Sequence, residues 1–182
     1  MRRTNSGMAR GLQGVPGVGV PTGGLTGQHL TKKSNVNFDT EWSEHPYGEL
    51  VIVANVTPLS LPTQSVFVKQ TGWAADQTLN TTLDGPNGTI EVLVAGEYRT
   101  ICSVDIDLVG THTYQLQLFK NGIAIVGHTR NLHTQANSIV SAVITGIDTF
   151  AVNDVLDLRV APLTNAGDAV TIEYANFTIT QI

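Results

Sequence analysis

A single cysteine, Cys102, is present among the 182 residues, so the chain cannot form an internal disulfide. No apolar run approaches the roughly 20 residues of a membrane-spanning helix, which argues against membrane insertion. No apolar segment follows the charged N-terminus, so we do not expect a secretory signal there. Only 14% of the residues are charged and 41% are hydrophobic, which excludes disorder throughout the chain.

Acidic residues are absent from the first 38 positions, and the basic residues there are Arg2, Arg3, Arg10, Lys32 and Lys33. All fifteen acidic residues lie beyond them, which leaves net charges of +5 and −10 for the two parts. This asymmetry is typical of a tail that contacts an acidic partner, although the same charges also serve solubility. Nucleic acid is not an expected partner, because the basic density is low and no aromatic residue precedes Phe38.

Residues 1–48 lack the pattern of a packed domain and are rich in glycine. In the stretch GLQGVPGVG (11–19), glycine occupies every third position, as the crowded axis of a collagen triple helix requires. Three triplets are too few to hold such a helix alone, so a flexible or extended linker is the other interpretation. We therefore predict an extended, non-globular N-terminal arm over 1–48 and a folded domain over 49–182.

From residue 49 onward, apolar and polar residues alternate with period two, and no useful window shows the 3.6-residue period of a helix. Turn-forming residues separate these segments, and their polar outer faces argue against a parallel sheet buried on both sides. The fold class predicted is all-β, an antiparallel jelly-roll sandwich. The predicted strands lie within 49–55, 64–70, 88–94, 103–108, 113–120, 137–147, 155–160 and 169–182. The residues predicted to face the core include Val104, Ile106, Leu108, Tyr114, Leu116, Leu118, Leu156, Leu158 and Val160.

Two local irregularities follow from the same pattern. Asn121-Gly122 separates two alternating segments and predicts a tight hairpin turn. The apolar phase of the last segment shifts between Tyr174 and Phe177, which predicts a β-bulge near Ala175–Asn176.

The alternation also predicts apolar residues on the outer faces of the sandwich, namely Phe67, Phe119 and Ile125. A monomer would leave that surface exposed to water. Assembly into a homotrimer about the long axis, the state that the family resemblance given below implies, would bury it and gather three arms at one end. Three weak arm contacts then act jointly, with an avidity ~10²–10⁴ above that of one contact.

Residues 85–182 resemble the trimeric jelly rolls of the tumour-necrosis-factor family and the globular heads of complement-type collagenous proteins. The resemblance rests on GEYRTICSVDI (96–106), YQLQLFKNGIAI (114–125), SIVSAVITGIDTFAVNDVLDLRV (138–160) and the final strand. One departure is FAVNDVLDL (150–158), where the family more often has a Gly-Asp pair.

A second resemblance covers GVPTGGLTGQHLTKKSNVNFDTEW (19–42), which is similar to a segment of bacteriophage fibres and collagen-like virion proteins. The matching positions are Pro21, Gly23, Gly24, Gly27, Gln28, Leu30, Lys32, Asp39, Thr40 and Trp42. His29 stands where an aliphatic residue is expected. The resemblance implies a virion protein that carries an N-terminal attachment arm and a C-terminal trimeric head.

No residue pattern predicts a catalytic site, a metal site or a cofactor. The serines lack a Gly-x-Ser-x-Gly setting. His128 and His133 are five residues apart, on opposite faces of a strand, so a shared ion is disfavoured and solvated loop histidines are expected. Asp105 and Asp107 share a strand face and are expected to form a wet surface with Gln115 and Gln117 of a neighbouring strand.

Taken together, the residue patterns and the two resemblances imply a non-enzymatic phage virion protein, a homotrimer that decorates the capsid as a cement protein or short head fibre. The arm would bind the major capsid protein or another virion protein, and the predicted attachment residues are Arg2, Arg3, Arg10, Lys32, Lys33 and Trp42. One alternative is a receptor-binding tip of a tail fibre or baseplate that recognises a host surface glycan. An enzyme such as a glycan depolymerase is a third interpretation, and fold alone does not decide among the three.

Overall fold

The computed structural model describes residues 21, 24–25, 28–36, 39–134 and 138–182. The predicted attachment residues Arg2, Arg3 and Arg10 lie outside the described residues, as does the whole of the glycine triplet stretch 11–19. The described chain consists of strands and connecting turns, and none of it forms a helix able to cross a membrane. The chain divides into two compact units, Met1–Glu44 and His45–Ile182.

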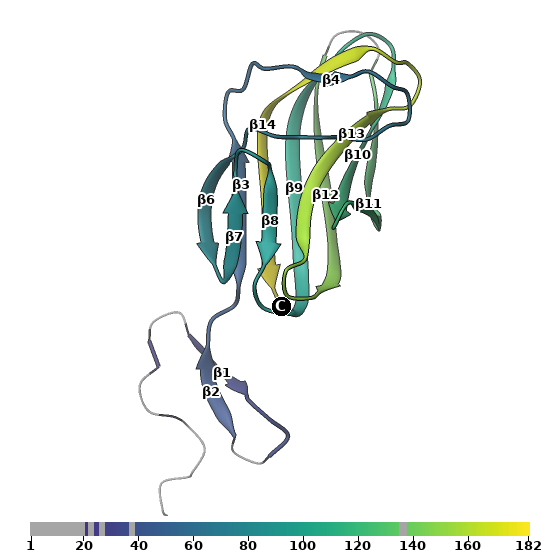
Figure 1. Ribbon diagram of the computed structural model, residues 1–182. Helices are drawn as coiled ribbons and strands as arrows, with labels where there is room; N and C mark the ends of the chain where they lie inside the picture. Colours follow the sequence, from purple (N-terminus) through teal and green to yellow (C-terminus); the bar gives the residue numbers. More distant parts are fainter. Residues whose placement is uncertain (1–20, 22–23, 26–27, 37–38, 135–137) are drawn as a thin grey trace, which may run out of the picture. The chain divides into compact units, whose positions relative to one another are not determined.

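The second unit is a sandwich of two antiparallel sheets, which confirms the predicted all-β jelly roll (Figure 1). One sheet contains, in spatial order, β12 (Ser138–Phe150), β9 (Gly96–Leu108), β14 (Asp168–Gln181), β3 (Tyr47–Ile52) and β6 (Ala74–Leu79), and β4 (Leu59–Leu61) also pairs with β14. The other contains β11 (Ile123–His133), β10 (Thr113–Lys120), β13 (Val155–Pro162), β8 (Thr89–Val92) and β7 (Thr81–Asp84), and β5 (Val68–Lys69) also pairs with β13.

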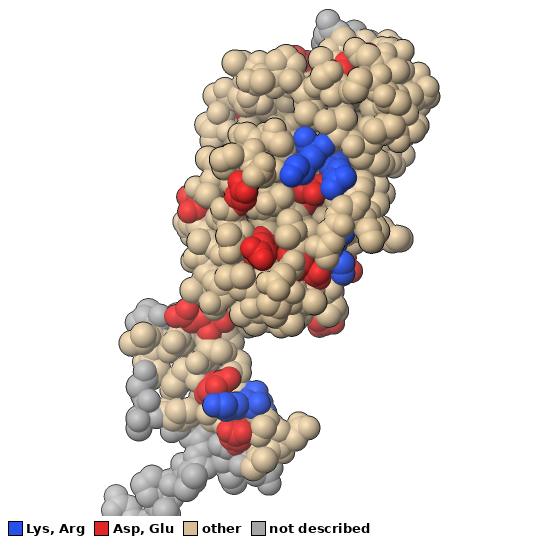
Figure 2. All heavy atoms as spheres, in the orientation of Figure 1, with Lys and Arg blue, Asp and Glu red and all other residues tan. Residues whose placement is uncertain are grey.

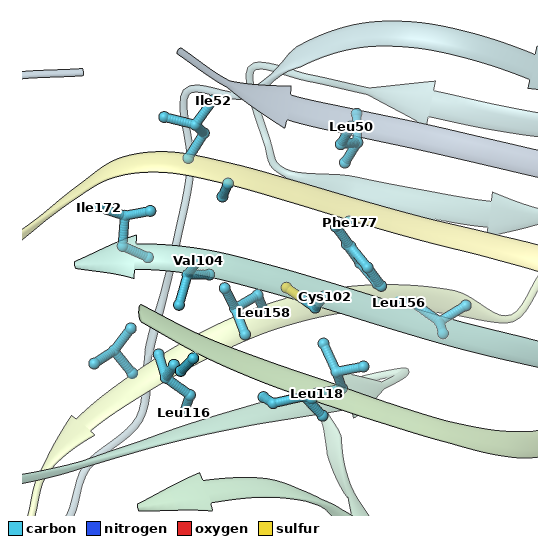
Figure 3. Close-up of a cluster of buried hydrophobic side chains, with 14 of the residues drawn as sticks. Leu50, Ile52, Cys102, Val104, Leu116, Leu118, Leu156, Leu158, Ile172 and Phe177 are labelled. Carbon is cyan, nitrogen blue, oxygen red and sulfur yellow. The ribbon is translucent and has the colours of Figure 1, made fainter. Parts of the chain in front are cut away.

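The core lies between the two sheets and is built from the inward positions of long alternating strands. Leu116 and Leu118 of β10 are fully buried, and so are Leu156 and Leu158 of β13. Figure 3 shows these side chains pointing toward those of the opposite sheet, including Phe177. All nine residues predicted to face the core are buried. The two-residue alternation therefore predicted correctly which face of these strands is buried.

The turn between β10 and β11 has the predicted hairpin geometry. Asn121 and Gly122 have φ values of +52° and +78°, so both central residues are left-handed, as in a type I′ turn. The Asn121 side chain adds two hydrogen bonds to this end of the head. Its Nδ2 donates to Asp154 Oδ1 at 2.7 Å, and its Oδ1 accepts from the Val155 amide at 2.8 Å.

Some local predictions were wrong. Within 64–70 only Val68–Lys69 is a strand, and β4, β6 and β7 carried too weak an alternation to be predicted. The bulge lies between Ile172 and Tyr174, where the register with β9 shifts, rather than near Ala175–Asn176. Before the bulge the even-numbered residues of β14 face the core, and after it the odd-numbered residues do. The Tyr174 ring therefore lies on the outer face of the sheet.

The first unit contains a two-stranded sheet that the sequence pattern did not predict. Strands β1 (His29–Lys32) and β2 (Thr40–Ser43) pair antiparallel. The division between the units falls after Glu44, and β3 of the head begins at Tyr47, within the stretch assigned to the arm. We refer below to the described residues within 21–43 as the attachment hairpin, after the role predicted from the sequence, and to residues 45–182 as the head.

Buried ionisable groups predict how the head responds to alkali. Cys102 is 1% exposed, and burial raises the pKa of its thiol to about 12. Burial also raises the pKa of Tyr98 and of Tyr114, and a hydrogen bond to Asp168 adds to the effect at Tyr114. The folded head keeps these protons at a pH where the unfolded chain releases them. Their stabilising contribution is thus complete below about pH 8.5, the usual thiol value, and is lost as the pH rises.

We expect the free energy of unfolding to fall above about pH 8.5, with ~1.4 kcal/mol per pH unit from the thiol alone. The variant Cys102→Ala should show a shallower decline between about pH 9 and pH 10, because unfolded tyrosines ionise only near pH 10. The control Val104→Ala, at another buried position of β9, should keep the original slope. Urea unfolding at a series of pH values and one protein concentration measures both, and an unchanged slope in Cys102→Ala would contradict the assignment.

Candidate functional site

The outer face of the sheet β12–β9–β14–β3 carries several exposed apolar side chains. Along β12, the outward positions Ile139, Val143 and Ile147 are each more than half exposed. The neighbouring strands add Ile101 of β9 and Tyr174 of β14. We call this surface the apolar face. Clustering of large apolar residues on one side of one sheet is typical of an interaction surface.

Strand register places these apolar residues on diagonals of the sheet, each directly opposite a polar residue of the paired strand, so that Ile101 is the diagonal neighbour of Val143 and Ile147. Each strand of this sheet exposes every second residue, and neighbouring strands align their outward positions into rows. Val143 lies opposite Ser103, which lies opposite Asn176, and Thr145 lies opposite Ile101. The bulge in β14 brings Tyr174 into the row of Asp105. Without the bulge, Tyr174 would share the buried parity of Ile172.

The apolar face is hollowed near its centre. Short side chains on β9 lie between larger ones on the flanking strands and leave a hollow of about 340 Å³. Asp105 is held at this place by Ser141, whose Oγ donates to Asp105 Oδ1 at 2.6 Å. The outward side chains that line the hollow include Val51, Val53, Ser103, Asp105, Ser141, Val143, Tyr174 and Asn176. The face thus combines protruding aliphatic groups with a recess for a complementary surface.

The apolar residues that the sequence pattern placed outside are not the ones exposed. Phe119 and Ile125 are 7% and 8% exposed, so the prediction that they form an open apolar surface was wrong. The Arg159 guanidinium lies 4.2 Å from the centre of the Phe119 ring, and Phe67 packs edge-on against that ring at 5.2 Å. Asp157 holds the guanidinium with bonds of 2.6 Å and 3.0 Å. Long-range packing therefore covers Phe119 on the opposite sheet.

The expected wet surface of Asp105, Asp107, Gln115 and Gln117 was also wrong. The aspartates lie in β9, which pairs with β12 and β14, whereas the glutamines lie in β10 of the other sheet. Alternation identified the outward side of each strand correctly, but it contains no information on which strands are neighbours.

His128 differs from the expectation of solvated histidines. It is 4% exposed, and its Nδ1 lies 3.3 Å from Asp148 Oδ2 of β12. Gly146 provides the room for this ring, because a Cβ added there would lie 2.6 Å from His128 Cδ2 and closer still to Nε2. His128 therefore closes the side of the sandwich where β11 meets β12. His133 is exposed, so the two histidines are indeed separated.

A second buried polar cluster surrounds Asp168, the first residue of β14. Tyr114 donates its hydroxyl to Asp168 Oδ2 at 2.8 Å, and Asn165 donates to Oδ1 at 2.9 Å. His112 Nδ1 lies 2.9 Å from the same Oδ2. These contacts satisfy a buried carboxylate, so the cluster joins the loop at 165 to β10.

Trp73 is likewise structural: it is 4% exposed, and its indole donates to the Gln70 carbonyl at 3.1 Å. Within the described part of the chain, no three His, Cys, Asp or Glu side chains are grouped as a metal ion requires.

The predicted attachment residues within the described chain all belong to the attachment hairpin. Lys32 Nζ donates to the Val36 carbonyl at 3.0 Å, and Lys33 pairs with Glu41 at 3.4 Å. Trp42 donates its indole N–H to the Pro21 carbonyl at 2.8 Å. Both lysines are exposed, so they remain accessible to a partner.

In the view of Figure 2, the surface of the head is mostly neutral, and its few basic side chains lie among acidic ones. That face offers no continuous positive field of the kind that tracks a phosphate backbone.

The apolar face was not found from the sequence, because exposure of Ile101, Val143 and Ile147 depends on what packs against each strand. The available signal was the run of apolar residues on both sides of 139–147.

Comparisons with known proteins agree on the fold. Murine APRIL at pH 5.0 superposes with a TM-score of 0.56 and 13% identity, over 76% of this chain and 100% of that chain. Eiger TNF from S. frugiperda gives 0.55 and 13%, over 75% and 93%. The globular domain of zebrafish complement 1qA protein gives 0.52 and 14%, over 75% and 97%. No family model and no curated protein sequence matches the chain. The predicted likeness to tumour-necrosis-factor and complement-head jelly rolls is therefore confirmed at the level of fold.

Proposed function

We propose that this chain is a non-enzymatic structural protein of a bacteriophage virion. Three copies associate through the apolar face of the head, and the N-terminal segment fastens the trimer to the particle. The position favoured is the outer capsid surface, where the protein acts as a decoration protein or short head fibre bound to the major capsid protein. The observation that carries the proposal is the apolar face, a recessed and water-exposed aliphatic surface on an otherwise well-packed head.

Burial of aliphatic surface supplies the driving force for assembly. Each of Ile139, Val143 and Ile147 exposes more than half of its surface, and covering a side chain of this size contributes about 1–2 kcal/mol. Strand β12 is an edge strand of the sheet β12–β9–β14–β3–β6, and these three residues lie in one line along it. The trimeric families that the sequence resembles support three copies as the number.

The virion location rests on the segment 19–42 and on the charge of the N-terminal part. That part has basic residues and, before Asp39, no acidic ones. Lys32 and Lys33 are exposed on the attachment hairpin, which favours contact with an acidic surface. Trimeric presentation multiplies weak contacts of this kind.

Deletion of residues 1–33 tests the attachment role. We expect the truncated protein to keep the mass of a trimer in light scattering but to lose co-sedimentation with purified particles of the source phage. The double charge reversal Lys32→Glu with Lys33→Glu separates charge from bulk and should weaken binding in a salt-dependent way. Binding of the truncated trimer at full strength would contradict attachment through this segment.

A second candidate function is recognition of a host surface glycan, and one polar hollow favours it. This hollow of about 240 Å³ is lined by Asn55, Thr57, Pro58, Leu59, Gln70, Thr71 and Gly72, with no charged side chain. Gln70 is 5% exposed, and its Nε2 donates to the Thr71 carbonyl at 2.7 Å. That bond fixes the amide, and Oε1 receives no hydrogen bond from the described residues. Such a lining suits a neutral hydroxyl-rich ligand.

Immunogold electron microscopy of intact particles, with antibody against residues 85–182, distinguishes the two functions. Decoration predicts dense label over the icosahedral head. Receptor recognition predicts sparse label at the tail end and free protein that blocks adsorption to the host. Tail-end label would overturn capsid decoration and direct attention to the hollow at Gln70.

A further inference from the structure

Three short connections between strands lie at the end of the head where β3 begins. They are residues 93–95 between β8 and β9, residues 121–122 between β10 and β11, and residues 151–154 between β12 and β13. Strand register fixes the first of them at that end, because Tyr47 of β3 lies opposite Thr180, which lies opposite Arg99 near the start of β9. Figure 1 shows β8 ending and β9 beginning there. We call the three connections, together with Ile123, the base of the head.

Hydrogen bonds join the three connections to one another. The Val92 amide donates to the Asp154 carbonyl at 2.9 Å, and the Asn153 amide donates to the Val92 carbonyl at 2.8 Å. The Asn121 amide donates to the Val155 carbonyl at 2.8 Å, and its side chain adds the bonds to Asp154 and Val155 described for the hairpin turn. The connections therefore form one firmly held surface.

The side chains that the base presents to solvent are apolar, although connecting segments more often carry polar residues. Their exposed fractions are 43% for Leu93, 38% for Val94, 74% for Ile123 and 51% for Val152. None of residues 93–95, 121–123 and 151–153 is charged. Because these side chains come from connections that are hydrogen-bonded to one another, they form a patch rather than scattered single exposures.

Charged side chains lie at the border of the base. Asp154 Oδ2 accepts from the Ala151 amide at 2.9 Å and lies 3.9 Å from Lys120 Nζ. Glu97, near the start of β9, is exposed. An apolar centre with a charged rim is typical of a surface that binds another protein.

The base stays open in the proposed trimer. The apolar face consists of outward side chains within strands, whereas the base lies beyond the ends of those strands. Association of three heads about their long axis therefore brings three bases to the same end of the assembly. Weak contacts made by each base then act jointly.

Chain connectivity indicates what the base meets. Only residues 44–46 separate the end of β2 at Ser43 from the start of β3 at Tyr47, and three residues span at most roughly 10 Å. The segment proposed to bind the particle is therefore joined to the head at the base and not at the opposite end. A particle that holds this segment is the protein surface most available to the base.

We propose that the base is a second contact with the particle and packs against an apolar area of the capsid protein. This inference rests on the proposed function. The basic residues of the N-terminal segment supply an attraction that salt screens, and the base supplies an apolar contact that salt does not screen. The two contacts act together on one trimer.

Co-sedimentation of the full-length protein with purified particles tests the base. In the double variant Ile123→Ser with Val152→Ser, which adds no charge, we expect affinity to fall at least roughly tenfold, because apolar burial is lost in all three copies. The loss should be as large at about 1 M sodium chloride, where the Debye length is about 3 Å, as at low salt. The matched control Val56→Ser with Val66→Ser removes side chains that are 85% and 49% exposed at the opposite end of the head, and it should bind normally.

The outcomes separate the base from the proposed function. A double variant that stays trimeric in light scattering and binds as tightly as the unmodified protein overturns the base and leaves attachment through the N-terminal segment intact. An equal loss in the control, or no binding of the unmodified protein at about 1 M salt, has the same consequence. Absence of binding by the unmodified trimer at low salt overturns the proposed function as well.

Two other occupants of the base are also distinguished. Pairs of trimers that the double variant dissolves in light scattering would assign the base to a second copy. Increased hydrogen exchange at the base of the free trimer after deletion of residues 1–33 would assign it to the N-terminal segment of the same chain. Either result overturns the inference.

Discussion

The variant Val143→Asp is expected to be a monomer at micromolar concentration, with the mass of one 19.4 kDa chain instead of three. Val143 lies near the centre of the apolar face and lines its hollow, so a carboxylate there would be buried without a partner in the assembled protein. An unpaired buried charge costs several kcal/mol, and the cost recurs in each of three interfaces. Light scattering measures the mass directly.

The same variant should bind particles far more weakly. With one attachment segment per molecule, the loss of avidity reduces apparent affinity by ~10²–10⁴. The fold should persist, because Val143 is 57% exposed in a single chain and surface substitutions usually change stability by about 0.5 kcal/mol or less. Circular dichroism checks that point.

A matched control uses the same substitution elsewhere. Val126 in β11 is 94% exposed and lies outside the apolar face, so Val126→Asp should remain a trimer and bind normally. A trimeric Val143→Asp, or a monomeric Val126→Asp, would show that another surface holds the copies together.

The largest stability effect is expected for Gly146→Ala. The added methyl group would overlap the His128 ring, which is buried at 4% exposure. Overpacking of this kind typically costs about 1–3 kcal/mol. The midpoint of thermal unfolding should therefore fall by about 2–4 °C for each kcal/mol in a chain of this length.

Removal of the ring should relieve the clash. In the double variant Gly146→Ala with His128→Ala, we expect part of the lost stability to return, so that the two changes are non-additive. Neither His128 nitrogen makes a well-aligned hydrogen bond within the described chain, although Nδ1 lies 3.3 Å from Asp148 Oδ2, so the ring itself contributes less than its burial suggests. Urea unfolding of the four proteins gives the coupling energy. Strict additivity would mean that the methyl group is tolerated by a movement of the backbone.

Much of the head was predictable because the relevant signals are local. In β9, β10 and β13, the alternation of apolar and polar residues identifies the buried face without any knowledge of neighbouring strands. Asn121-Gly122 identifies its turn because few other residue pairs adopt two left-handed conformations in succession. The candidate site was less predictable. Trp42 and the two lysines were singled out, but the hairpin that positions them depends on contacts with Pro21 and Gly24.

By itself, the sequence determined that the chain forms antiparallel strands, which side of most strands is buried and where one hairpin turns, because those properties depend on a few adjacent residues. Only the tertiary structure decided which of the outward-facing residues remain exposed to solvent. Phe119 is covered by Arg159 and Phe67, whereas Val143 and Tyr174 are left open. Strand neighbours and the exact site of the β14 bulge are set by pairing between residues distant in the chain. Alternation of apolar and polar residues shows which residues share one face of a strand. Whether that face is buried depends on the strands and side chains that pack against it.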